Sequence, residues 1–354
     1  MRTNNGSFRS GDVDILLRDI TGQIQPTPTN ERERLIQSGV HYSEMLPLEQ
    51  SSSEKYLAEY YSALNEFGTD TARAVANVSE LIYREHGRNV ALVSLARAGT
   101  PVGVLIKRYL SKKYGIDVPH YTISIVRGRG IDKTAMKYIL SRHAARDLQF
   151  TDGWTGKGAI LNELSVAAED FFPITDRRKL LAVLADPANV TDICGTHEDF
   201  PIASSFLNST VCGLMSRTVM RNGIEPDELH GVVFYSEFAG EDHTYEFIER
   251  IESEFDFDSF VKPAAVQGLG IDEVRRIAGD FDAKDINFVK PGIGEATRVL
   301  LRRLPDVLLV SETAEERQIR HLLRLAEEKA VPVVRYPLKN YIACGIIKTL
   351  SADA

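Results

Sequence analysis

Four short, largely apolar runs most constrain what this chain of 354 residues can fold into. They lie at 90–96, 120–126, 148–151 and 179–185, and loops that contain glycine follow the first three, with helix-like segments after them. Apolar runs of this length are typical of strands that are buried on both faces of a parallel sheet. The pattern predicts an α/β domain with a doubly wound parallel sheet, whose loops meet at the carboxyl edge of the strands.

The loop after the third run has the composition of an anion-binding turn. Asp152 ends the apolar run, and three glycines then precede a helix-like segment at 159–168. Glycine lets the backbone approach a phosphate closely, and the N–H groups at a helix start favour negative charge. Thr155 adds a hydroxyl donor, and Asp152 can accept from sugar hydroxyls or hold Mg²⁺. The spacing is not that of a Walker loop, and a glycine-rich turn without a ligand is the alternative.

Two further loops carry arginines close to glycines. Arg97 and Gly99 follow the first run, and Arg127-Gly-Arg129-Gly130 follows the second. Arg97 is interpreted either as a donor to a bound anion or as a member of a structural ion pair. Arg127 and Arg129 are interpreted as a mobile cationic segment that converges on phosphate, with an ordinary solvated turn as the alternative.

Positive and negative charges are distributed unevenly along the chain. The net charge is −8, yet the segment 284–348 contains twelve Lys/Arg against eight Asp/Glu. A basic unit on an acidic body suggests a separate module with an anionic partner, and a solvated helix face of mixed charge is the alternative. We therefore expect an N-terminal arm at 1–50, an α/β domain at 51–260, a linker at 261–283 and a small α/β unit at 284–354.

The three cysteines, Cys194, Cys212 and Cys344, supply neither a disulfide framework nor a zinc set. Cys194 and His197 stand three residues apart, which invites a nucleophile–base interpretation, but the sequence identifies no third group. No apolar run reaches the roughly 18 residues of a membrane span, and the N-terminus lacks an apolar signal core. We expect a cytoplasmic protein without a membrane partner.

In this order, the three loops resemble those of the type I phosphoribosyltransferases, which bind phosphoribosyl pyrophosphate (PRPP). The resemblance implies a type I phosphoribosyltransferase-like sheet domain that binds PRPP or a related sugar phosphate with Mg²⁺, the ion being held through the substrate at Asp152. It implies catalytic roles for Asp152, Arg97, Arg127 and Arg129. The expected substrate-binding residues are Ala96, Ala98, Gly99, Gly153, Trp154, Thr155, Gly156, Lys157, Gly158, Ser204, Asn208 and Arg217, the last three facing a nucleobase-like acceptor.

The C-terminal unit resembles a different family. Gly292-x-Gly294-Glu295-x-x-Arg298 opens a helix in an α-β-α-β order, as in the pelota-type RNA-binding fold. This resemblance implies an RNA partner. The residues expected to contact RNA are Lys290, Gly292, Gly294, Glu295, Arg298 and Arg302.

Almost the whole chain resembles the phosphoribosyltransferase-plus-pelota proteins of bacterial tellurite-resistance (Ter) stress systems, some of whose relatives are labelled cysteine protease StiP. The resemblance implies a phosphoribosyl-type transferase in a stress response. Two alternatives stay open. One is a cysteine peptidase that uses Cys194 or Cys212 with His197. The other is a catalytically inert nucleotide sensor, which the absence of a second acid beside Asp152 favours. The oligomeric state, homo-oligomer or not, stays open too.

Overall fold

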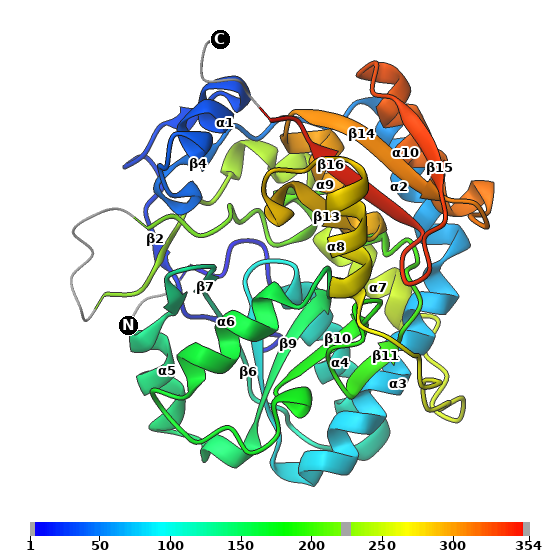
Figure 1. Ribbon diagram of the computed structural model, residues 1–354. Helices are drawn as coiled ribbons and strands as arrows, with labels where there is room; N and C mark the ends of the chain where they lie inside the picture. The colour runs from blue at the N-terminus through cyan, green and yellow to red at the C-terminus, as the bar shows by residue number, and fades with distance from the viewer. Residues whose placement is uncertain (1–3, 221–227, 350–354) are drawn as a thin grey trace.

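The computed structural model describes residues 4–220 and 228–349. A parallel sheet of six strands forms its larger part (Figure 1). In sheet order the strands are β1 (Asp14–Ile15), β6 (His120–Ile123), β5 (Ala91–Leu95), β9 (Leu148–Trp154), β10 (Leu181–Ala185) and β11 (Ile193–Thr196). Every neighbouring pair in this sheet is parallel. The predicted α/β domain with a large parallel sheet is therefore confirmed.

Helices cover both faces of this sheet. In β5, Leu92 packs into the core cluster that contains residues of α3 and α4, whereas Val93 packs with residues of α5 and α6. Successive side chains of a strand point to opposite faces, so the apolar run at 90–96 serves two cores. Through the described residues, the helices are α1 (Thr29–Gln37), α2 (Glu54–Glu66), α3 (Gly68–His86), α4 (Gly99–Tyr114), α5 (Lys133–Leu140), α6 (Ala159–Ala168), α7 (Thr244–Glu252), α8 (Gly270–Asp280), α9 (Ile293–Arg302) and α10 (Glu316–Glu328).

A smaller sheet of four strands builds the C-terminal unit. Its strands, in sheet order, are β13 (Val289–Pro291), β16 (Ala343–Ile347), β14 (Pro305–Ser311) and β15 (Val333–Tyr336). The β14–β15 pair is parallel, and the pairs that involve β16 are antiparallel. Ile293, Leu308 and Ile319 of this unit belong to the same core cluster as Tyr60 of α2, so the two parts share one apolar interior.

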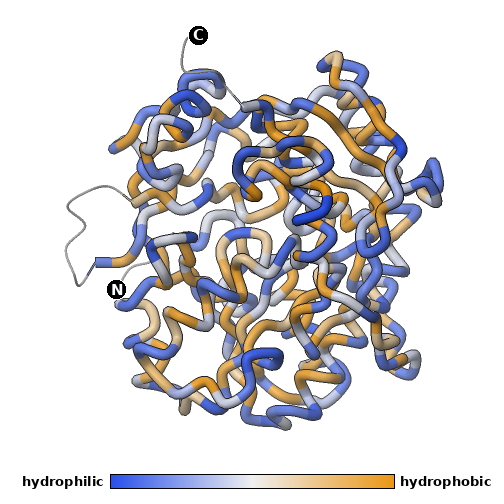
Figure 2. The backbone as a smooth tube through the Cα atoms, viewed as in Figure 1, coloured by the Kyte–Doolittle hydropathy of each residue, from blue (hydrophilic) through white to orange (hydrophobic). Residues whose placement is uncertain are grey.

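Short strand pairs complete the fold. They are β2 (Arg18–Asp19) with β12 (Gly231–Val232), β3 (Pro26–Thr27) with β4 (Leu46–Pro47), and β7 (Ile125–Val126) with β8 (Gly130–Ile131). Figure 2 shows hydrophobic stretches along strands of both sheets. None of the helices in the described segments has the length and apolar content that a membrane crossing requires.

The segment 191–219 shows how tertiary context decides local structure. Its sequence is dense in small polar residues, yet residues 193–196 form β11 at the edge of the large sheet. The run Thr-Asp-Ile-Cys-Gly-Thr is short and polar, and it becomes a strand because its backbone pairs with β10. Tertiary pairing overrides the local sequence preference at this edge.

Candidate active site

The edge formed by β10 and β11 brings three chemically reactive side chains together. Asp186 follows directly on β10, Cys194 lies within β11, and His197 follows directly on β11. The register pairs Val183 with Cys194 and Ala185 with Thr196. Parallel strands end at the same edge of a sheet, so this register places Asp186 opposite His197.

The distances within this cluster are those of hydrogen-bonded groups. Cys194 Sγ lies 3.6 Å from His197 Nε2 and 3.9 Å from Nδ1. His197 Nδ1 lies 3.0 Å from the backbone oxygen of Asp186 and 3.5 Å from its carboxylate Oδ2. A thiol, an imidazole beside it and a group that orients the imidazole form the arrangement of an activated nucleophile.

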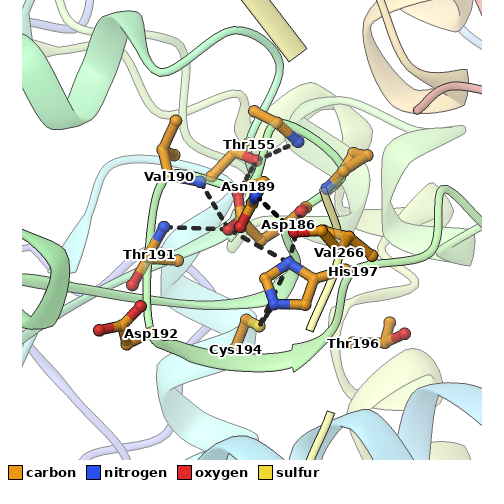
Figure 3. A network of polar contacts seen from close by, with 12 residues as sticks. Thr155, Asp186, Asn189, Val190, Thr191, Asp192, Cys194, Thr196, His197 and Val266 are labelled. Atoms are coloured by element: carbon orange, nitrogen blue, oxygen red, sulfur yellow. Dashed lines mark hydrogen bonds and ion pairs between the residues drawn. The ribbon is translucent and has the colours of Figure 1, made fainter. Parts of the chain in front are cut away.

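The loop around Asp186 holds its carboxylate in one position, as Figure 3 shows. Thr155 Oγ1 donates to Oδ1 over 2.5 Å. The backbone N–H groups of Val190 and Thr191 donate to Oδ2 over 2.8 and 2.9 Å. A carboxylate with three donors of its own is fixed in place before it meets the imidazole of His197, as an orienting acid must be.

Burial and hydrogen bonding determine the protonation states of Cys194 and His197. The hydrogen bond to Asp186, followed by that to Cys194, raises the pKa of His197 to about 10. Desolvation raises the pKa of the Cys194 thiol above its ordinary value, and His197 counteracts only part of this effect. At neutral pH the resting pair is therefore an imidazolium beside a thiol. The thiolate, which is the nucleophilic form, becomes populated as the pH rises.

The thiol of Cys194 is shielded from solvent. Cys194 is 1% exposed, so a substrate carbonyl reaches Sγ only when the surrounding chain opens.

The same three groups could also be considered as metal ligands. The ligand atoms of Asp186, Cys194 and His197 lie within 4.8 Å of one another, and sulfur, nitrogen and oxygen are donors that zinc accepts. Both carboxylate oxygens already accept hydrogen bonds from Thr155, Val190 and Thr191, which favours an orienting acid over a metal ligand.

A second feature is a cavity of about 620 Å³ between the large sheet and the C-terminal unit. The predicted loops after β5 and β9 both reach it, since Ala98 of the first and Gly156 of the second line the cavity. Burial raises the pKa of Asp152 to about 6. Of the residues predicted to catalyse or to bind substrate, those that line the cavity are Ala98, Arg127, Asp152, Trp154, Thr155, Gly156, Lys157, Gly158 and Arg217.

Other predicted residues lie outside the cavity lining. Arg97 donates to the backbone oxygen of Met215 over 2.8 Å, and Arg129 forms an ion pair with Glu44. Both arginines thus have structural partners. The remaining predicted residues that do not line the cavity are Ala96, Gly99, Gly153, Ser204 and Asn208.

Only some of the residues predicted to contact RNA line the cavity. Lys290, Glu295 and Arg298 line the cavity, whereas Gly292, Gly294 and Arg302 do not. Gly294 packs on Trp154, because a Cβ there would lie 2.6 Å from the indole ring. Arg298 stacks over the same ring at 4.6 Å and pairs with Glu295 at 3.0 Å. The start of α9 therefore faces the large domain.

Cys212 and Cys344 lack the surroundings of Cys194. Cys212 is buried, and no histidine lies within hydrogen-bonding reach of its sulfur among residues 4–220 and 228–349. Burial also raises the pKa of Cys344, to about 12, in the middle of β16. Of the two cysteines proposed as a nucleophile from sequence, only Cys194 has a histidine beside it within the described residues.

Fold and side chains thus define an α/β protein with a Cys–His–Asp constellation and a small C-terminal module, an arrangement that fits a cysteine protease. Residues 6–252 match the family "Tellurite-like stress resistance cysteine protease StiP", and residues 268–349 match the "PELOTA RNA binding domain". A protein of Acinetobacter baylyi (strain ATCC 33305 / BD413 / ADP1), named "Cysteine protease StiP", is 34% identical over 366 residues, covering 98% of this chain and 94% of the relative. The chain belongs to the StiP family. No solved structure matches it.

These matches correct the predicted function. The family and the relative are named for a cysteine protease, so phosphoribosyl transfer, the glycosyltransferase class and PRPP as the substrate are wrong. β9 runs two residues beyond Asp152, and the loop 155–158 then leads into α6 as predicted, but a loop shape does not determine the reaction. The tellurite-type stress role and the pelota module are confirmed as family features.

Asp186 is the member of this cluster that the sequence did not reveal. It lies directly after the apolar run at 179–185. The available signal was an acid directly after a buried apolar run, where the carboxyl edge of a parallel sheet collects functional side chains. His197 could be linked to Asp186 only once the pairing of β10 with β11 was known.

Proposed function

We propose that this protein is a cysteine peptidase in which Cys194 is the nucleophile, His197 the general base and Asp186 the group that orients His197. The observation that carries the proposal is the approach of Cys194 Sγ to His197 Nε2, 3.6 Å, with Asp186 at the other ring nitrogen. The names of the family and of the relative support it.

The proposed reaction uses only these three side chains and water. In the reactive state His197 is neutral and its Nε2 accepts the proton of Cys194 Sγ, and the resulting thiolate forms a bond with the peptide carbonyl carbon. The C–N bond then breaks, and His197 returns the proton to the leaving amine. His197 next takes a proton from water, whose oxygen attacks the thioester, and thiol and carboxylate product separate. Asp186 keeps Nδ1 protonated, so that Nε2 is the ring nitrogen that accepts the proton.

In the resting protein Cys194 is buried and His197 is protonated, so we interpret this state as a latent form of the peptidase. We expect low basal activity at neutral pH, because the chain must open and the imidazolium must lose its proton before attack. Fluorescently labelled casein serves as the substrate for the test, with Cys194→Ala against Cys212→Ala as the matched control. Hydrolysis should stop in Cys194→Ala and continue in Cys212→Ala. Hydrolysis that survives Cys194→Ala, with the variant purified to homogeneity, would refute the assignment.

The C-terminal module supports a second, separable role in RNA binding. Its match to the PELOTA RNA binding domain is the supporting observation. The start of α9 is packed on Trp154, so RNA contact through Arg298 requires that this interface opens. Fluorescence anisotropy with a labelled, kinked RNA duplex tests the role. Binding should weaken steeply with salt, as contacts to phosphates do, and an affinity indifferent to salt would contradict it.

We also infer that the larger domain has the type I phosphoribosyltransferase-like fold class without the transfer reaction. The six-stranded parallel sheet and the glycine loop between β9 and α6 support this inference. An experimental structure that matches this class in strand order would test it. Mg²⁺ at Asp152 likewise stays a prediction.

A further inference from the structure

Residues 261–269, called the connecting segment below, carry an unusual share of exposed apolar side chains. They lie at the junction of the two family matches, 6–252 and 268–349, and form neither helix nor strand. Val261, Val266 and Leu269 are 63%, 40% and 44% exposed. They are three of the eight large hydrophobic side chains exposed among the described residues. Exposed apolar groups gathered in one place indicate a contact that they serve.

One end of the connecting segment is tied to the strand that carries the nucleophile. The side-chain oxygen of Asn77, a buried residue of α3, accepts from the backbone N–H of Val261 over 2.9 Å. The side-chain nitrogen of Asn77 donates to the backbone oxygen of Gly195 over 3.0 Å. Gly195 directly follows Cys194 in β11. One buried amide therefore holds both the connecting segment and the strand of Cys194.

The other end of the connecting segment is tied to the loop that carries the acid. Asn189 lies three residues after Asp186. Its Nδ2 donates to the backbone oxygens of Val266 and Gly268 over 3.1 and 2.9 Å, and Figure 3 shows Val266 beside this loop. The connecting segment thus runs between the strand of Cys194 and the loop of Asp186.

Held in this way, the connecting segment has the properties of a peptide presented to a peptidase. Proteolysis takes place in exposed chain that lies outside helices and strands. Cys194 is reached only when the chain around it opens, and a peptide tethered at the same place is then the first one available. Tethering replaces a bimolecular encounter by an intramolecular one, which raises the effective concentration of the peptide.

We propose that the connecting segment is a substrate of the peptidase on the same chain, which cleaves it between Val261 and Leu269. This inference rests on the proposed function of Cys194. The thiolate forms a bond with a carbonyl carbon of the segment, the C–N bond breaks, and His197 donates its proton to the new amino terminus. Water then hydrolyses the thioester, so each cut consumes one water molecule and needs no other reactant.

The test follows the purified full-length protein over time at pH 9 under reducing conditions, by denaturing gel electrophoresis and mass spectrometry. Denaturation is needed because the two parts share one apolar interior and stay associated after a cut. We expect two fragments whose masses sum to that of the intact chain plus one water, with the new ends between Val261 and Leu269. The rate should not change on dilution, because enzyme and substrate are one chain.

Four variants sharpen the test. Cys194→Ala should stay intact, whereas Cys212→Ala should be cleaved like the wild type. Val266→Asp should be cleaved about tenfold more slowly, because a pocket that accepts an apolar side chain rejects a charge. Val166→Asp is the matched control, since Val166 on α6 is a 72% exposed valine outside the connecting segment, and its cleavage should not change.

Hydrolysis of labelled casein, measured in the same samples, separates this inference from the peptidase proposal. Casein hydrolysis by a protein whose connecting segment stays intact would overturn the inference and leave the peptidase proposal standing. Fragments from Cys194→Ala, new ends outside 261–269, or a rate constant proportional to protein concentration would also overturn it. If neither casein nor the connecting segment is cleaved, the peptidase proposal is refuted and the inference with it.

Discussion

The Cys194 cluster and the cationic cavity lie close together, yet they differ in how their charges are balanced. At the edge of β10 and β11, the carboxylate of Asp186 and the ring of His197 have partners on the chain itself. In the cavity, the Nε atoms of Arg32 and Arg217 have no hydrogen-bond partner among the described residues. The first region is balanced by its own hydrogen bonds, whereas the second keeps buried cationic groups that are only partly satisfied. An ordered reactive cluster and a region of unbalanced charge therefore lie side by side in this fold.

The largest effect is expected when the charge of Asp186 is removed. Asp186→Asn keeps the shape but loses the negative charge that raises the pKa of His197. We expect kcat/KM for casein to fall by about 10³- to 10⁴-fold, as in other triads that lose their acid. Circular dichroism should show an unchanged fold. A fall of less than tenfold in a folded variant would mean that Asp186 does not orient the base.

The pH dependence of the Cys194 cluster has the next largest effect. Desolvation raises the pKa of Cys194, so its thiolate is scarce at neutral pH and increases as the pH rises. We expect alkylation of Cys194 by iodoacetamide to accelerate about 100-fold between pH 7 and pH 9. A flat alkylation profile would contradict the thiol–imidazolium resting state.

Thr155 joins the two regions, and its removal has a smaller expected effect. Its hydroxyl donates to Asp186 over 2.5 Å, and the residue also lines the cavity. Thr155→Val should lower kcat/KM about tenfold, since one hydrogen bond to a charged group is worth about 1.5 kcal/mol. Thr313→Val provides a control outside both regions. Equal activity of Thr155→Val and wild type would show that the regions are uncoupled.

The smallest effect concerns the interface between the two parts. A Cβ on Gly294 would meet the Trp154 ring at 2.6 Å, whereas nothing lies within 4 Å of one on Gly279, in the helix α8 that packs on the small sheet. Gly294→Ala should destabilise the protein by about 1–3 kcal/mol, and its midpoint of thermal unfolding should fall by a few degrees. Gly279→Ala should be neutral or stabilising. If both variants melted alike, the contact with Trp154 would carry no stability.

The sequence predicts the interior of the fold better than its edge. The apolar runs of β5 and β10 and the helix after Gly158 are visible locally, since burial on both faces demands continuous apolar side chains. β11 is short and polar, and its pairing with β10 decides its conformation. The positions of Asp186 and His197 opposite one another therefore could not be read from spacing alone.

The predicted chemistry failed for a related reason. The glycine loop after Asp152 and the turn at Ala98 both reach one cavity, as the resemblance to phosphoribosyltransferases implied. Together they form part of a positively charged cavity, but neither the shape nor the charge of a cavity determines which reaction takes place. The predicted peptidase alternative named Cys194 and His197 without the third group, because Asp186 becomes their neighbour only through the register of two strands.

The most direct measurement of the central claim is a stoichiometric titration of activity with an iodoacetamide–alkyne probe, followed by mass spectrometry of the labelled peptides. We predict that Cys194 is labelled before Cys212 and Cys344, and that casein hydrolysis disappears in proportion, reaching zero at one label per chain. His197→Ala should slow this labelling. Full hydrolysis by protein that is completely labelled at Cys194 would contradict the account.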